Sequence, residues 1–156
     1  MEPTDAELVT AWGLVLEATS RAGRVLAAEI EQAVGLPATW VEVLFRLRRT
    51  PDNVLPTTQL ARAVSFSSGG FTKLLDHLVA AGLVERVPCP TDRRVIYASL
   101  TGRGRDTADA ALAVHAAGLR AHILGVLGPE RLLALAETSR ALRDSASPSD
   151  ASPSAD

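Results

Sequence analysis

Apolar residues recur at three- and four-residue steps over two long stretches near the ends of the chain. Residues 5–33 predict one amphipathic helix, which Gly23 interrupts at a modest cost. A second long helix is expected over 101–127, because Thr101 is a good N-cap residue. A Gly-Pro pair then ends that helix and begins a last one over about 129–143.

In the middle of the chain the segments with helical periodicity are shorter. A helix over about 37–49 is followed by a turn at 50–53 and by two short helices at 58–64 and 68–81. Two short helices joined by a tight connection predict a helix-turn-helix. Their apolar side chains are expected to face the core, namely Leu60, Ala61, Val64, Phe71, Leu74, Leu75, Leu78 and Val79.

The period changes to that of strands at 83–87 and 95–100, which are rich in β-branched residues. The segment between them holds two prolines, an aspartate and two arginines, and this composition predicts a hairpin with a basic tip. A hairpin that directly follows a helix-turn-helix is a wing. The predicted fold is therefore mainly α with a small β-hairpin wing, a winged helix-turn-helix with long N- and C-terminal dimerisation helices.

This organisation predicts four segments: 1–50 for dimerisation and support, 51–100 as the winged DNA-binding unit, 101–144 for dimerisation, and 145–156 as a disordered tail. The tail contains only Ser, Ala, Pro and Asp. The apolar stripes of the long helices exceed what a small middle unit can cover. We therefore expect a homodimer, and the alternative is a monomer whose stripes pack internally.

The charge distribution changes what the composition implies. The net charge of −2 over 156 residues argues against a nucleic-acid binder, since such domains are usually basic. Residues 46–105, however, hold ten basic and four acidic residues, whereas the remainder holds six basic and fourteen acidic ones. This asymmetry indicates a middle that faces a polyanion, unless it is a chance scatter of surface charge.

Other functional classes find little support. A single cysteine excludes an intrachain disulfide framework, and no apolar run or N-terminal segment predicts a membrane span or a secretory signal, so we expect a cytoplasmic protein. The three histidines, His77, His115 and His122, form no metal-binding or catalytic pattern, and no nucleotide-binding or hydrolase motif is present. We expect no enzyme, no cofactor and no metal.

The order of these elements resembles the MarR family of bacterial transcription regulators. The most specific stretch runs from the Leu-Val-Glu-Arg of 83–86, through the Asp-Arg-Arg of 92–94, to the Leu-Thr-x-x-Gly of 100–104. The resemblance implies a homodimeric repressor or activator on a pseudo-palindromic double-stranded operator, often released by a small phenolic or other hydrophobic effector. Three features depart from the family pattern: His77 replaces a common Arg, Gly69-Gly70 begins the second short helix, and Cys89 lies in the wing.

The candidate DNA-binding residues fall in three groups. Those of the second short helix and its start are Ser67, Ser68, Gly69, Thr72, Lys73 and His77, and those of the wing are Asp92, Arg93 and Arg94. Arg62 and Arg86 are weaker phosphate candidates. The resemblance implies that Arg94 enters the minor groove while Asp92 orients it, and Arg93 would contact a phosphate. The alternative is a solvated basic loop.

Two further features have a functional and a structural interpretation. Trp12, Trp40 and Phe45 could line an effector crevice, or they could simply pack in the core. Cys89 could sense oxidation, since nearby arginines would lower its thiol pKa, or it could be a small loop residue between prolines. For the whole chain the alternatives are a winged-helix protein-interaction module without DNA binding and an uncharacterised cytoplasmic enzyme.

Overall fold

The computed structural model describes residues 2–64, 68–89, 91–92 and 94–145. The chain divides into two compact units, residues 1–118 and 119–156. The predicted disordered tail falls almost wholly outside the described residues, as do Ser67 and Arg93. The assignment of roles to four sequence segments stays a prediction.

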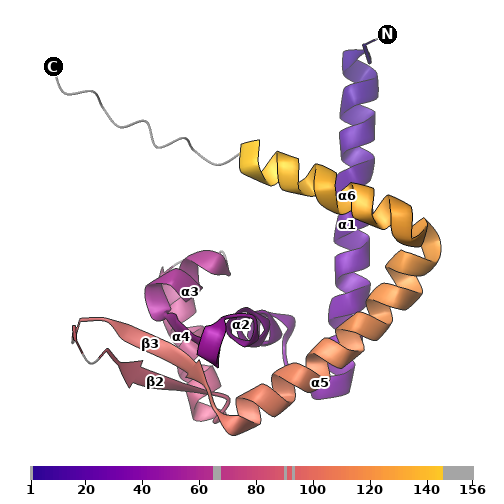
Figure 1. Cartoon of the computed structure of the whole chain (residues 1–156). Helices are drawn as coiled ribbons and strands as arrows, with labels where there is room; N and C mark the ends of the chain where they lie inside the picture. The colour runs from indigo at the N-terminus through magenta and orange to yellow at the C-terminus, as the bar shows by residue number, and fades with distance from the viewer. Residues whose placement is uncertain (1, 65–67, 90, 93, 146–156) are drawn as a thin grey trace, which may run out of the picture. The chain divides into compact units, whose positions relative to one another are not determined.

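The first unit contains most of the secondary structure (Figure 1). Its helices and strands, in chain order, are α1 (Asp5–Val34), α2 (Ala38–Arg48), the 3₁₀ turn η1 (Pro51–Asn53), β1 (Val54–Pro56), α3 (Thr57–Ala63), α4 (Ser68–Ala80), β2 (Val84–Pro88), β3 (Ile96–Leu100) and α5 (Gly102–Gly118). These bounds confirm the predicted helices of residues 5–81 to within one or two residues.

Both ends of α1 have a local cause. The backbone N–H of Thr4 donates to Glu7 Oε2 at 2.8 Å, and the Thr4 side chain accepts from the Glu7 N–H, which makes a capping box. Gly35 ends the helix in the left-handed conformation at φ 68°. In the chain by itself, only Leu26 and Ile30 of α1 are fully buried.

The helix-turn-helix of α3 and α4 is built on α2. Leu74, Leu75 and Leu78 of α4 are buried in the main core, and α2 contributes three further buried residues to the same core, Val43, Leu44 and Leu47. Gly82 then adopts φ 66° and turns the chain into β2. The inward face predicted for α3 and α4 is confirmed.

The sheet has one more strand than predicted. The hairpin of β2 and β3, called the wing, pairs Val84 with Leu100 and Pro88 with Ile96. Residues 54–56, expected only to lead into α3, form β1 and pair with β3 in the order β1-β3-β2. The strand has three residues and includes Pro56, which an edge strand tolerates, so it leaves almost no alternating pattern in the sequence.

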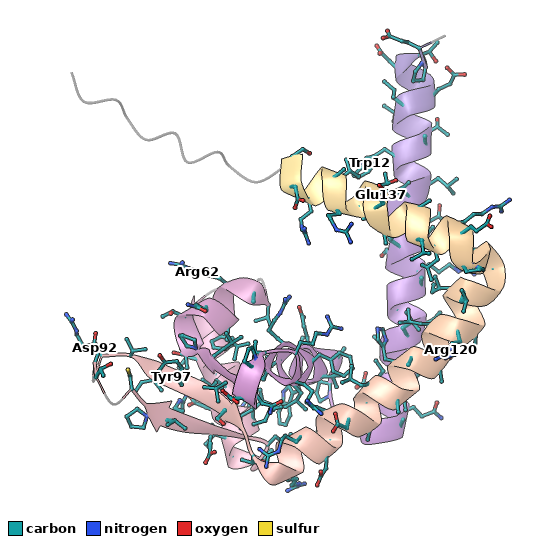
Figure 2. All side chains as sticks on the ribbon, viewed as in Figure 1. Trp12, Arg62, Asp92, Tyr97, Arg120 and Glu137 are labelled. Carbon is teal, nitrogen blue, oxygen red and sulfur yellow. The ribbon has the colours of Figure 1, made fainter. Side chains whose placement is uncertain are left out.

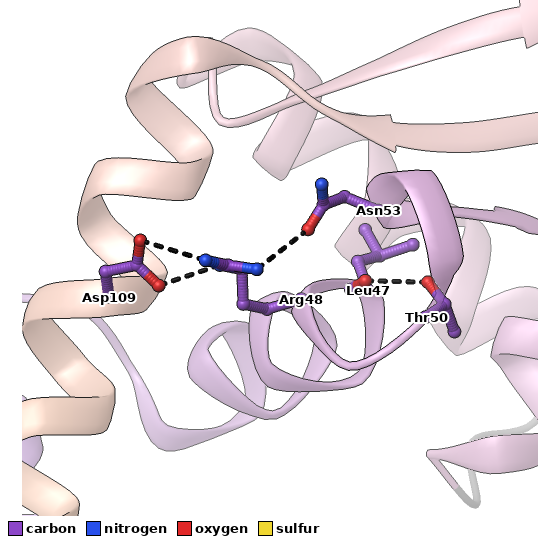
Figure 3. A network of polar contacts seen from close by, with 5 residues as sticks. All are labelled: Leu47, Arg48, Thr50, Asn53 and Asp109. Atoms are coloured by element: carbon purple, nitrogen blue, oxygen red, sulfur yellow. Dashed lines mark hydrogen bonds and ion pairs between the residues drawn. The ribbon is translucent and has the colours of Figure 1, made fainter.

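Two polar contacts fix α5 to the winged unit. The Thr101 hydroxyl donates to the Gly82 carbonyl at 2.7 Å and accepts from the Gly104 N–H at 2.9 Å, so Thr101 is the predicted N-cap. Arg48 of α2 pairs with Asp109 of α5, with 2.7 Å between Nε and Oδ1 and 3.3 Å between Nη2 and Oδ2 (Figure 3). The same guanidinium reaches Asn53 Oδ1 at 3.5 Å.

In the second unit the prediction of one α-helix up to about residue 127 is wrong. Residues Leu119–Leu124 form a π-helix, η2, which is followed by α6 (Gly125–Ser145). Three- and four-residue steps of apolar side chains do not distinguish α from π turns over so short a stretch. The predicted break at the Gly-Pro pair is confirmed, because Gly128 has the non-helical angles φ 72° and ψ 167°.

One helical stretch, Gly102–Ser145, is long and apolar enough by length and composition to cross a membrane. A count of uninterrupted apolar residues in the sequence does not reveal this stretch. A single stretch of this kind is weak evidence for a membrane span, because the core helix of a soluble protein passes the same test. Its apolar residues are mostly exposed in the chain by itself.

Candidate nucleic-acid interface

The outward face of α4 is polar. Its buried residues lie on one side of the helix, and Gly69, Thr72, Lys73 and Asp76 are exposed on the other. Lys73 is the only lysine in the chain. Ser68 is the first residue of α4, and its side chain lies outside the described part of the structure. The helix therefore presents one cation, one carboxylate and a hydroxyl to solvent.

Glycine at position 69 is not required by crowding inside the protein. A Cβ added to Gly69 would meet nothing within 4 Å. Gly69 and Gly70 occupy the first turn of α4, where helix propensity costs least. Among the described residues, packing therefore gives no reason for a glycine at position 69.

His77 has a partner that the sequence does not suggest. Its ring stacks on Trp40 of α2, with 6.1 Å between ring centroids and 26° between planes. His77 is exposed and Trp40 is half-buried. The predicted DNA contact by His77 is untested. One side of its ring stacks on Trp40 of α2.

At the wing tip the guanidinium of Arg94 pairs with the carboxylate of Asp92. Arg94 Nε lies 3.2 Å from Asp92 Oδ1, its Nη2 lies 3.3 Å from Oδ2, and its backbone N–H donates to Oδ1 at 3.0 Å. The arginine lowers the pKa of the Asp92 carboxyl, chiefly through the side-chain hydrogen bond. The Arg94 side chain is nevertheless 91% exposed. Asp92 is labelled at the tip of the hairpin in Figure 2.

A groove of about 510 Å³ lies between α3, α4 and the wing. Its polar lining includes Arg62, Thr72 and Arg86, together with Thr57 and Thr58 at the start of α3. Arg86 is paired with Asp76, with 2.7 Å between Nη2 and Oδ1. This ion pair joins the wing to α4 and partly neutralises the groove, so Arg62 is its more available cation (Figure 2).

Cys89 is half-buried at the base of the wing tip, and its Sγ lies 3.3 Å from Thr91 Oγ1. The side-chain hydrogen bond with Thr91 is the largest cause of a lowered pKa of the thiol, followed by hydrogen bonds with the backbone of Thr91 and Asp92. The sequence predicts that nearby arginines lower the pKa of this thiol. Among the described residues, hydrogen bonds lower it instead. Oxidation sensing stays a prediction.

The three aromatic residues proposed for an effector crevice are not brought together. A cavity of about 200 Å³ lies between α1, α2 and α5, and its lining residues include Leu26, Ile30, Val41, Phe45 and His115. Of the three, only Phe45 lines it. Trp40 lies five residues before Phe45 on α2, which places the two on different faces of the helix, and Trp12 is 52% exposed on α1.

His115 packs on Phe45 in this cavity, with 5.7 Å between ring centroids and 45° between planes. Burial lowers the pKa of His115, and the positive charge of Arg49 lowers it further. Its Nδ1 is buried and has no hydrogen-bond partner among the described residues. Among the described residues, no three His, Cys, Asp or Glu side chains are placed to hold a metal ion.

Comparison with solved structures places this geometry among known regulators. AbsC of Streptomyces coelicolor, a MarR family transcriptional regulator, is 28% identical, covers 92% of this chain and 96% of its own, and superposes with a TM-score of 0.80. Sco3205 of the same organism, solved in complex with DNA, is 26% identical over 100% of this chain and 96% of its own, with a TM-score of 0.83.

The sequence description of the MarR family matches residues 34–95. The matched segment is less than half of the chain, and over that segment the chain is similar to the MarR family. The multiple antibiotic resistance protein MarR of Escherichia coli (strain K12) is 41% identical over 46 residues, which are 30% of this chain and 32% of that relative. The chain thus spans about a third of the curated relative that it matches. Both the family resemblance and the winged-helix fold predicted from the sequence are confirmed.

The family match covers the candidate interface almost completely. It includes α2, α3, α4, β2 and the wing tip with Arg94, and it stops before β3. Most of α1 and all of α6 lie outside the matched residues.

Proposed function

We propose that this chain is a DNA-binding transcriptional regulator of the MarR type. The observation that carries the proposal is the guanidinium of Arg94, held at two points by Asp92 and yet 91% exposed at the wing tip. An exposed ion pair contributes little to the stability of a fold, so a role in binding a ligand explains this pairing better than a role in stability does. The DNA complex of the relative Sco3205 supports the same class of ligand.

In this proposal α4 is the recognition helix and enters the major groove, which is about 12 Å wide and admits a helix. The exposed residues of α4 meet the DNA, with Lys73 on a phosphate and Thr72 on a phosphate or base edge. The first turn of α4 at Gly69, together with the predicted contacts of Ser67 and Ser68, approaches the sugar-phosphate backbone of the DNA.

The elements that flank α4 contact the DNA on either side of the major groove. Arg94 enters the minor groove, where a narrow A·T-rich stretch attracts a guanidinium through its negative potential. The groove lined by Arg62, Thr72 and Arg86 faces a phosphate. Arg93, which lies outside the described residues, is assigned a neighbouring phosphate.

We further propose a homodimer on a pseudo-palindromic operator. Helix α1 exposes large apolar side chains along its N-terminal half, and α6 does so along its length; they are Leu8, Val9, Trp12, Leu14, Val15 and Leu16, and Val126, Leu133, Leu135 and Leu142. Exposed apolar surface of this extent is typical of an interface. A two-fold axis then places two recognition helices about 34–36 Å apart.

A small hydrophobic or phenolic effector is proposed for the cavity beside Phe45. A lining of Leu26, Ile30, Val41 and Phe45 favours an apolar molecule. Its volume of about 200 Å³ suits one aromatic ring with small substituents, since a cavity of about 150 Å³ accommodates benzene. Binding there would release the operator.

The second candidate is a winged-helix module that binds protein and not DNA. For both candidates we propose a cytoplasmic location. The net charge of −2 and the stacking of His77 on Trp40 favour it. A gel shift of the full chain on a pool of duplex DNA, repeated at rising salt, separates the two. Binding that weakens steeply with salt supports the regulator, because each neutralised phosphate adds about 0.9 to the slope of log K against log salt.

A further inference from the structure

Helix α2 presents two faces to two different parts of the molecule. Ala38, Val41, Glu42 and Phe45 line the cavity. The fully buried Val43, Leu44 and Leu47 pack in the core that α2 shares with α4. Trp40 lies on this same face, packs against that core and stacks on His77 of α4, with 6.1 Å between ring centroids. One helix of eleven residues thus separates the cavity from the recognition helix.

Each side of α2 carries one ring-on-ring contact with a histidine. Phe45 meets His115 of α5 at 5.7 Å on the cavity side, and Trp40 meets His77 on the side of α4. At about 100° per residue, the five-residue separation places Trp40 and Phe45 about 140° apart around the helix. A rotation of α2 that moves Phe45 away from the cavity therefore also moves the Trp40 ring.

The core limits how α2 can respond to a molecule in the cavity. Val43, Leu44 and Leu47 are 0% exposed, and a close-packed interior does not accommodate their translation. A molecule that displaces Phe45 is more easily accommodated by a small rotation or tilt of α2. Trp40 lies on the same face as these core residues but is only half-buried, so its ring follows such a rotation and carries the change to the exposed His77.

We propose that Trp40 is a positioning residue whose stack on His77 passes occupancy of the cavity to the recognition helix. The proposal rests on the proposed function of α4, and it assigns Trp40 no contact with DNA. Its consequence is that the cavity and the DNA surface communicate through α2, and that breaking the stack uncouples them without emptying the cavity.

A substitution can take the place of the unidentified effector. Gly23 lines the cavity, and a Cβ added there meets nothing within 4 Å. Gly23→Leu therefore fills the cavity from α1, and Gly23→Ala is its matched control, because both changes raise helix propensity. The expected result is that Gly23→Leu binds duplex DNA about tenfold more weakly than Gly23→Ala, a coupling of ordinary size.

The same pair of variants is then made in a Trp40→Leu background and, separately, in a His77→Ala background. The proposal predicts that the ratio of the DNA affinities of Gly23→Ala and Gly23→Leu falls from about ten to about one when the stack is broken. His77 is exposed, so His77→Ala keeps the test available if Trp40→Leu fails to fold. A ratio that stays near ten in His77→Ala, or a ratio near one in the otherwise unsubstituted chain, overturns the proposal.

A second readout needs no DNA. Stacking on Trp40 shields the His77 ring, so the NMR resonance of His77 Hε1 in the full chain reports the contact. Gly23→Leu is expected to shift this resonance toward its position in Trp40→Leu, whereas Gly23→Ala leaves it in place. An unmoved resonance contradicts the proposal even if the chain binds DNA. Failure to bind any duplex, with the resonance shifted as expected, instead contradicts only the proposed function.

Discussion

Arg94 and Asp92 form a two-point ion pair two residues apart at the tip of the wing, and a backbone N–H to Oδ1 contact at 3.0 Å closes the loop around it. The carboxylate limits the rotamers of an otherwise exposed guanidinium. Less conformational entropy is then lost when the guanidinium binds. In the proposed function, this pair prepares Arg94 for its contact with DNA.

Arg94→Ala is expected to lower affinity for the operator by about tenfold or more, because a groove-reading arginine contributes about 1–3 kcal/mol. Asp92→Asn should cause a smaller decrease, since it removes the orienting charge and keeps the cation. Fluorescence anisotropy with a labelled duplex measures both. The matched control is Arg143→Ala, which also removes an arginine paired with a neighbouring aspartate. Equal affinities for Arg94→Ala and Arg143→Ala would remove the wing from the mechanism.

Lys73→Ala is expected to weaken binding to all duplex sequences to a similar degree, because a lysine acts on phosphate as a point charge. The slope of log K against log salt should fall by about 0.9 for each phosphate that is no longer neutralised. Binding titrations at several salt concentrations, on an operator and on an unrelated duplex, measure this slope. A weakening confined to one base position would make Lys73 a base reader.

Gly104→Ala is expected to destabilise the fold without touching the DNA surface. A Cβ at this position would collide with the Leu83 carbonyl oxygen and lie 2.9 Å from the Leu83 carbonyl carbon, and backbone cannot move aside cheaply. Overpacking of this kind costs about 1–3 kcal/mol. Urea unfolding measures the change, with Gly102→Ala as control, since the atom nearest to its added Cβ is the flexible tip of Arg105 at 3.8 Å. Similar midpoints for the two variants would contradict the prediction.

The stability of the chain is expected to fall with acid through His115. Burial lowers its pKa, so the unfolded chain binds the proton more readily than the folded one. The stabilising contribution is complete above the ordinary value of about 6.5 and is lost as the pH falls through the lower pKa of the folded state. Urea midpoints between about pH 7.5 and about pH 5.5 should decline less in His115→Phe than in the unsubstituted chain. An identical decline in both would mean that other groups cause it.

Much of the fold was predictable because local physics determines it. The apolar period of α4, the N-cap at Thr101 and the left-handed glycine at Gly82 each depend on a few neighbouring residues. The wing pair of Asp92 and Arg94 was predictable for the same reason, since its members lie two positions apart in the chain.

The features that sequence reasoning missed depend on distant contacts or on short segments. Trp40 and His77 are far apart in the chain, and nothing in either helix signals their stacking. The ion pair of Asp76 and Arg86 joins a helix to a strand, so neither the helical nor the strand periodicity of the sequence predicts it. The strand β1 is too short to show alternation, and η2 is too short to separate a π from an α pattern.

Two copies of this chain are proposed to read one operator through α4 and the wing. Selection of bound duplexes from a random pool, followed by sedimentation of the complex, tests this most directly. We predict enrichment of two inverted half-sites whose centres lie about one helical turn apart, bound by a dimer. Failure to enrich any sequence at low salt, with the chain sedimenting as a monomer, would contradict it.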